Sequence, residues 1–99
     1  MGEVDAAERL AAEARAARRV DIIARLVREG AQRDQATLYA DLFLEYEEAS
    51  ANIARHGVIV QHPRTLNPID NPYLARRDRA RRELQRMRWI HAAWLWETA

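Results

Sequence analysis

The feature that most constrains the fold is a pair of helix boundaries in the middle of the chain. An apolar pattern of helical period stops at His56-Gly57, and glycine is the residue that most readily adopts the left-handed conformation after a helix end. Asn71-Pro72 supplies a side-chain N-cap followed by a proline, whose missing N–H costs nothing in a first helical turn. The sequence therefore predicts one helix that ends near residue 56 and another that begins near residue 72.

Three helices are predicted from composition and periodicity. Residues 5–29 contain no Gly or Pro before a terminating glycine, and they are rich in Ala, Arg, Glu and Leu, which favour helices. In residues 34–56 the apolar side chains recur at three- and four-residue steps, and Leu38 and Leu44 widen this apolar face so that it can make contacts on two sides. Residues 72–97 combine an apolar stripe with a basic one.

The segment 57–71 is predicted to be an extended connector. Val58-Ile59-Val60 is β-branched, as in a strand, but so short that we expect a lone extended segment. Three residues in the connector precede proline and are pushed out of the helical conformation. The short linker between the first two helices favours a hairpin. We therefore predict an all-α fold in one domain over residues 1–99, with an N-terminal antiparallel helical hairpin, an extended Pro-rich connector and a C-terminal Arg-rich helix.

Length and cysteine content limit how this chain can be stabilised. A domain of 99 residues buries only part of its surface alone, which favours contact with a partner. The chain has no cysteine, so it has neither disulfides nor thiolate metal sites. Its apolar runs are too short to span a bilayer, and its acidic beginning does not resemble a signal peptide. We expect a soluble protein of the cytoplasm with no membrane partner.

The net charge of +1 conceals two oppositely charged parts. Residues 1–54 hold seven Arg and eleven acidic residues, so their formal charge is −4, whereas residues 55–99 hold nine Arg and four acidic residues, so theirs is +5. All sixteen basic residues are Arg, which together with nineteen Ala indicates a GC-rich genome. Genome composition does not explain why seven of the sixteen lie in residues 76–88.

Residues suited to catalysis are sparse. The three histidines occur in separate contexts and lack the spacing of paired metal ligands. The acidic run at residues 45–48 could bind a metal together with Asp41, but such runs are more often solvated helix faces. Three glycines do not make a phosphate-binding loop. We expect no catalytic residue, no metal and no cofactor, and hence no enzymatic activity.

The arginines of the last predicted helix are the candidate DNA-binding residues. A guanidinium can bond a phosphate through two donors, and a row of them on a rigid helix supplies charge without ordering a loop. Two alternatives remain open: Asp78, Glu83 and the acidic second helix could neutralise the row, or the two charged parts could be complementary surfaces of an oligomer. The candidates are Arg76, Arg77, Arg79, Arg82 and Arg86.

Two apolar groups are candidate protein interfaces. The first lies on the second helix and is the predicted oligomer interface, formed by Tyr39, Leu42, Phe43 and Tyr46. The second lies near the end of the chain, where three tryptophans are more than one apolar stripe can bury. It is the predicted partner-binding site, with burial in the core or in an oligomer interface as the alternative, and it comprises Trp89, Trp94, Leu95 and Trp96.

The order of these features resembles the P27 type of phage terminase small subunit. A helix ending in "IARHGVIV", a loop with "NPIDNPYL" and an Arg- and Ala-rich helix carry the resemblance, which spans residues 36–87. It implies structural roles for Gly57, Asn71 and Pro72. It also implies a ring, commonly of about eight to twelve subunits, because small terminases form closed cyclic oligomers. The large terminase subunit, an ATPase-nuclease, and double-stranded DNA are the implied partners.

The chain departs from this pattern at both ends. Relatives have a longer N-terminal part with a DNA-binding unit and continue with a "GLTP"-like segment, whereas this chain begins with an Ala-rich helix and ends in "RWIHAAWLWETA". These departures imply weak, largely sequence-independent DNA binding by a reduced small terminase, from a phage or a gene transfer agent, that recruits the large subunit in the host cell cytoplasm. The alternative is a small helical regulator or antitoxin-like module that binds one protein.

Overall fold

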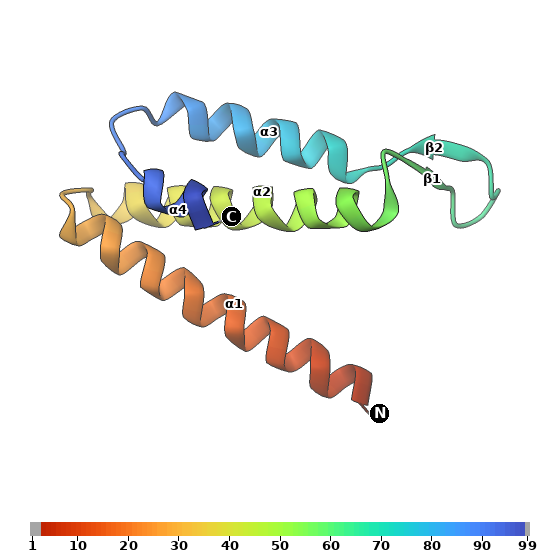
Figure 1. Cartoon of the computed structure of the whole chain (residues 1–99), viewed down its shortest axis with the longest axis horizontal. Coiled ribbons are helices and arrows are strands. Elements are labelled where there is room, and N and C mark those ends of the chain that lie inside the picture. The colour runs from red at the N-terminus through yellow and green to blue at the C-terminus, as the bar shows by residue number, and fades with distance from the viewer. Residues whose placement is uncertain (1–2, 99) are drawn as a thin grey trace. The chain divides into compact units, whose positions relative to one another are not determined.

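The computed structural model describes residues 3–98 and is mostly helical. The elements in chain order are α1 (Glu3–Arg28), α2 (Arg33–His56), β1 (Ile59–Gln61), β2 (Pro68–Asp70), α3 (Tyr73–Arg86) and α4 (Ala93–Thr98) (Figure 1). They form two compact units, Met1–Ala40 and Asp41–Ala99, with α2 continuing from the first into the second. None of the helices within residues 3–98 combines the length and the apolar character needed to cross a membrane.

The first unit contains α1 and the start of α2, which form the predicted helical hairpin. Gly30 adopts φ 109° after α1, as its sequence position predicted. The amide N–H of Ala31 donates to the carbonyl oxygen of Leu26, and that of Gly30 donates to the carbonyl oxygen of Val27. This pair of bonds is a Schellman motif, which satisfies carbonyl groups that the helix end would leave unpaired.

The end of α2 is also at the predicted position. Gly57 has φ 86°, and its N–H donates to the carbonyl oxygen of Ile53 over 2.7 Å, which closes the helix by the simpler left-handed capping motif. A side chain at position 57 would be strained by this backbone conformation.

The connector is more ordered than predicted. β1 is not a lone extended segment, because it pairs antiparallel with β2, with Val60 opposite Ile69. The tip of this β-hairpin is closed by His62, whose N–H donates to the carbonyl oxygen of Asn67 and whose carbonyl oxygen accepts from the N–H of Leu66. The imidazole Nδ1 of His62 accepts from the backbone N–H groups of Arg64 and Thr65 over 3.1 and 3.3 Å. His62 thus holds the turn through both its backbone and its side chain.

The single helix predicted over residues 72–97 is divided into α3 and α4. At Met87 the backbone leaves the helical conformation, with φ −95° and ψ 54°, and the N–H of Met87 donates to the carbonyl oxygen of Leu84. Met87, Ile90 and Leu95 are all buried on either side of the break. The chain thus turns to bury apolar side chains that a straight helix would present on one stripe.

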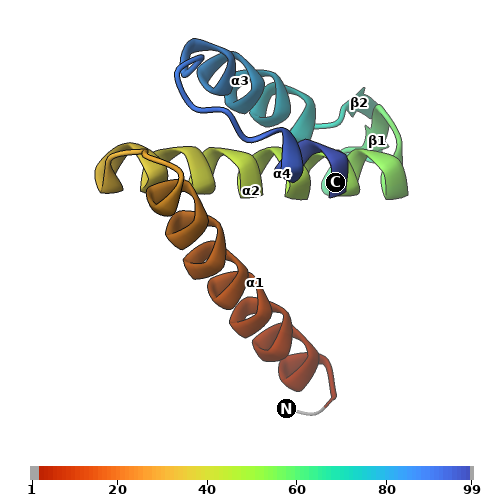
Figure 2. The same ribbon diagram turned by 60° about the vertical axis from the view of Figure 1, so that its left-hand side comes forward.

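The second unit has its own apolar core, formed by α2 from residue 41 onward together with α3 and α4. In both views α3 runs alongside α2 in the opposite direction, and α4 lies against α2 (Figures 1 and 2). The ring of Trp96 meets Phe43 edge-on, with 4.9 Å between ring centroids. The buried apolar residues of this unit are Phe43, Leu44, Ala49, Ile53, Ala80, Leu84, Met87, Ile90, Ala92 and Leu95.

Candidate nucleic-acid interface

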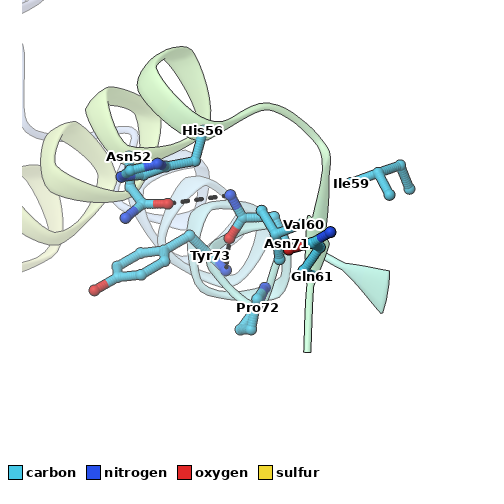
Figure 3. Close-up of a pocket in the computed structure, with 8 residues that line it drawn as sticks. All are labelled: Asn52, His56, Ile59, Val60, Gln61, Asn71, Pro72 and Tyr73. Atoms are coloured by element: carbon cyan, nitrogen blue, oxygen red, sulfur yellow. Dashed lines mark hydrogen bonds between the residues drawn. The ribbon is translucent and has the colours of Figure 1, made fainter. Parts of the chain in front are cut away.

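The orientation of α3 is set by Asn71, a buried polar residue that is 2% exposed. Its carboxamide Oδ1 accepts from the N–H of Tyr73 over 3.0 Å, which is the N-cap bond that the sequence predicted. Its Nδ2 donates to Asn52 Oδ1 over 3.1 Å and to the carbonyl oxygen of Gly57 over 2.9 Å. Figure 3 shows the Asn71 side chain between Asn52 of α2 and Tyr73 of α3. One side chain therefore joins the end of α2 to the start of α3.

A groove of about 510 Å³ borders this junction, between the end of α2, β1 and the start of α3. Its lining includes His56 and Tyr73 together with the two asparagines (Figure 3). Within residues 3–98 no group of three or more His, Cys, Asp or Glu side chains is placed to hold a metal ion. The groove thus has a single histidine in its lining, and the amide groups of Asn52 and Asn71 already bond each other.

Residues on α3 divide by helical geometry into a buried and an outward face. Ala80 and Leu84, four residues apart, are buried. Because successive residues turn by 100°, Arg82 points away from that side, with Arg79 and Arg86 on the same outward stripe. All three are exposed, as predicted for a basic row.

Ion pairs occupy three of the five predicted DNA-binding arginines. Arg79 Nη2 lies 2.9 Å from Glu45 Oε1 on α2, and Arg86 Nη1 lies 3.1 Å from Glu83 Oε1 one turn back on α3. Arg77 Nε lies 3.8 Å from Asp78 Oδ1 and is only partly exposed. Acidic neighbours thus neutralise part of the row, which was one of the alternatives left open by the sequence.

The other two predicted arginines have different surroundings. The guanidinium of Arg76 lies over the ring of Tyr73, 4.9 Å from its centroid, in a cation–π contact. Arg82 is exposed and makes no hydrogen bond or ion pair with any residue between 3 and 98. Of the predicted set, Arg82 is therefore the residue whose charge is most available to a ligand.

Two further exposed arginines were missed as site residues. Arg81 lies on the flank of α3, off the outward stripe, and Arg88 lies beyond the end of the helix. Arg82, Gln85, Arg86 and Arg88 together line an open hollow of about 440 Å³. The density of Arg in residues 76–88 was the available signal, but a stripe drawn on one continuous helix could not place a residue after the break.

The predicted oligomer interface on α2 contains two kinds of residue. Phe43 has no exposed surface and Tyr39 is also buried, so both are core residues of the single chain. Leu42 and Tyr46 are half-buried. Leu38 is 53% exposed and is the accessible apolar residue of this helix. The proposed interface therefore keeps Leu42 and Tyr46, gains Leu38, and loses the two core residues.

The predicted partner-binding residues near the end of the chain also differ in their exposure. Leu95 is 2% exposed, so it cannot reach a partner unless α4 unfolds, and we leave it out of the proposed partner-binding site. Trp94 is half-buried. Trp96 is 39% exposed, and its ring packs against Phe43 and Tyr46. The ring centroids of Trp96 and Tyr46 are 5.2 Å apart. Trp89 is 58% exposed and is the tryptophan best placed to meet another protein.

Comparison with known proteins gives one match. A family model described as phage terminase, small subunit, matches residues 17–88, from the middle of α1 to just beyond α3. No curated protein and no solved structure matches the chain. The matched region covers most of the chain and includes every arginine of the segment 76–88.

Proposed function

The chain belongs to the phage terminase small-subunit family and has a role in phage DNA packaging. We propose that in this role it binds DNA through α3 and recruits the large terminase subunit. We also propose that it is not itself an enzyme. The DNA-binding part of this proposal rests on the exposed arginines of the outward face of α3. Its arginines stand on a rigid helix whose start is held by the buried Asn71.

The ion pairs on α3 are compatible with DNA binding. The side chains of Arg79 and Arg86 are 64% and 73% exposed, and exposed ion pairs contribute only about 0–1 kcal/mol. A phosphate can accept bidentate bonds from a guanidinium, so DNA can displace these carboxylates at little cost. Because phosphates carry no sequence information, binding through this face is expected to be largely independent of sequence.

DNA binding should fall steeply as salt is raised. Each phosphate contact releases counterions, so the logarithm of the binding constant should decrease linearly with the logarithm of salt concentration. Replacing Arg79 and Arg82 with Glu should weaken binding and make this dependence shallower. Fluorescence anisotropy with two unrelated duplexes of equal length measures both effects. A protected region confined to one short sequence and insensitive to salt would count against this mode of binding.

We also propose that the chain assembles into a ring, of about eight to twelve subunits, as closed cyclic symmetry allows. Large apolar side chains on the two long helices that are exposed in the single chain support this proposal, because a neighbouring subunit would remove their surface from water. They are Leu10, Val20 and Leu38.

Replacing Leu38 with Ser should reduce the oligomer to smaller species while the chain stays folded, because its side chain is exposed in the single chain. Native mass spectrometry and light scattering at tens of micromolar, roughly where weak interfaces fill, measure assembly. Glu48→Ser, at another exposed position of α2, is the control and should leave the mass unchanged. A clean monomer for the unaltered chain would remove the ring proposal and favour the small regulatory module.

A further inference from the structure

The hollow at the end of α3 has a lining of hydrogen-bond donors. Its four side chains are Arg82, Gln85, Arg86 and Arg88, and no carboxylate is among them. Every one of them can donate hydrogen bonds, and only the Gln85 carboxamide can also accept. A surface that is concave, cationic and rich in donors matches the requirements of an oxyanion with several acceptor oxygens.

The break in the last predicted helix creates this arrangement. Arg82, Gln85 and Arg86 share the outward face of α3 because they are three and four residues apart. At Met87 the backbone leaves the helix, with ψ 54°, and the N–H of Ile90 donates to the carbonyl oxygen of Met87. This turn brings Arg88 to the same hollow as the helical residues. The break thus has a second consequence besides burying Met87.

A favourable interaction with the helix dipole does not explain all three arginines of the hollow. A cation in the last turn of a helix interacts favourably with the helix dipole, and Arg86 occupies that turn. Arg82 lies a turn earlier and Arg88 lies beyond the helix, and within residues 3–98 neither forms a hydrogen bond or an ion pair. Two guanidinium groups at one hollow, close to a third, repel one another in the absence of an anion.

We propose that this hollow binds one phosphate group of the DNA backbone, so that DNA affinity is concentrated at the C-terminal end of α3 rather than spread along its basic row. This inference rests on the proposed DNA-binding function. Arg82 and Arg88 offer guanidinium donors that are not engaged elsewhere within the described chain, and the Gln85 amide can donate to a further oxygen. Arg77 and Arg79, which are tied to Asp78 and Glu45, contribute less.

Glu83 is not part of the lining, but it competes with a phosphate for one lining residue, Arg86. Its Oε1 accepts from Arg86 Nη1 over 3.1 Å, so the Arg86 guanidinium must exchange this carboxylate for the phosphate when DNA binds. Removing the carboxylate should therefore favour DNA. Asp78 provides a matched comparison, because it is an acidic residue of the same helix whose partner, Arg77, does not line the hollow.

The test measures duplex-DNA affinity of the full chain over a range of salt. The double variant Arg82→Gln/Arg88→Gln should bind at least about tenfold more weakly, with the salt slope reduced by about one. The control Arg76→Gln/Arg81→Gln removes the same amount of charge from α3 at positions outside the hollow, and its affinity should fall by less than about threefold. Circular dichroism checks that both variants are folded, as expected for exposed residues.

A second pair of variants tests the competitor. Glu83→Gln should raise the affinity by up to about fivefold, whereas Asp78→Asn should raise it less. Equal losses of affinity in the two arginine double variants, or equal gains in the two acidic variants, would overturn the proposed phosphate site. Either result would leave the proposal of DNA binding by α3 intact. Absence of any salt-dependent DNA binding by the unaltered chain would instead reject the proposed function.

Discussion

Replacing Asn71 with alanine should lower the free energy of unfolding by about 2–4 kcal/mol. The substitution removes three hydrogen bonds at once, to Tyr73 N–H, to the carbonyl oxygen of Gly57 and to Asn52 Oδ1. Because Asn71 is 2% exposed, water cannot simply replace its carboxamide. The end of α2 and the start of α3 would each lose a partner. Urea unfolding followed by circular dichroism measures the change.

Asn67 provides the matched control, because it also precedes a proline in the same connector. Its side chain is exposed and forms no hydrogen bond with any residue between 3 and 98, although its backbone closes the β-hairpin. Asn67→Ala should therefore change the free energy of unfolding by no more than about 0.5 kcal/mol. Equal effects of the two substitutions would show that the Asn-Pro pairs act through local turn preference and not through the buried junction.

The helix ends could be predicted because their signals are local. Gly30 and Gly57 each adopt the left-handed conformation that few other residues tolerate, and Asn71 caps α3 with its own side chain. Each of these interactions joins residues that are close in the sequence. The helical hairpin of the first unit then follows from the short linker at Gly30.

The features missed by sequence analysis depend on contacts between distant residues. β2 begins with Pro68 and is not rich in β-branched residues, so nothing in it indicated a strand, and β1 is ordered only by pairing with it. The break at Met87 occurs without Gly or Pro, in residues whose helix propensity does not forbid continuation. Burial of Ile90 and Leu95 outweighs that propensity, and burial cannot be known before the neighbours are placed.

The candidate site could be predicted only in part, because some of its features are local and others depend on contacts between distant residues. Density and spacing of Arg indicated the basic face of α3. Which arginines are engaged depended on partners such as Glu45, which is 34 residues from Arg79 in the sequence. The predicted interface residues Phe43 and Tyr39 had the right apolar spacing, but spacing alone does not show whether an apolar side faces the core or another subunit.

Deleting residues 94–99 should destabilise the fold rather than only abolish binding to the large terminase subunit. The deletion removes the buried Leu95, and replacing a buried Leu costs about 2–5 kcal/mol. It also removes the contacts of the Trp96 ring with Phe43 and Tyr46, each worth about 0.5–1.5 kcal/mol. The sum is a large part of the stability of about 5–15 kcal/mol typical of a small domain. Helicity and melting temperature should both fall.

Trp89 and Trp96 allow the structural and the binding roles of this region to be measured separately. Trp96→Ala should lower the free energy of unfolding by about 2–3 kcal/mol, because its ring closes over Phe43 and Tyr46. Trp89→Ala should destabilise less, because Trp89 is 58% exposed, and it should weaken capture of the chain by the large subunit, as expected for an aromatic anchor. If a chain ending at Ala93 keeps its helicity, its melting temperature and its assembly, then α4 is not part of the core. If Trp89→Ala binds the large subunit as tightly as the unaltered chain, the docking surface lies elsewhere.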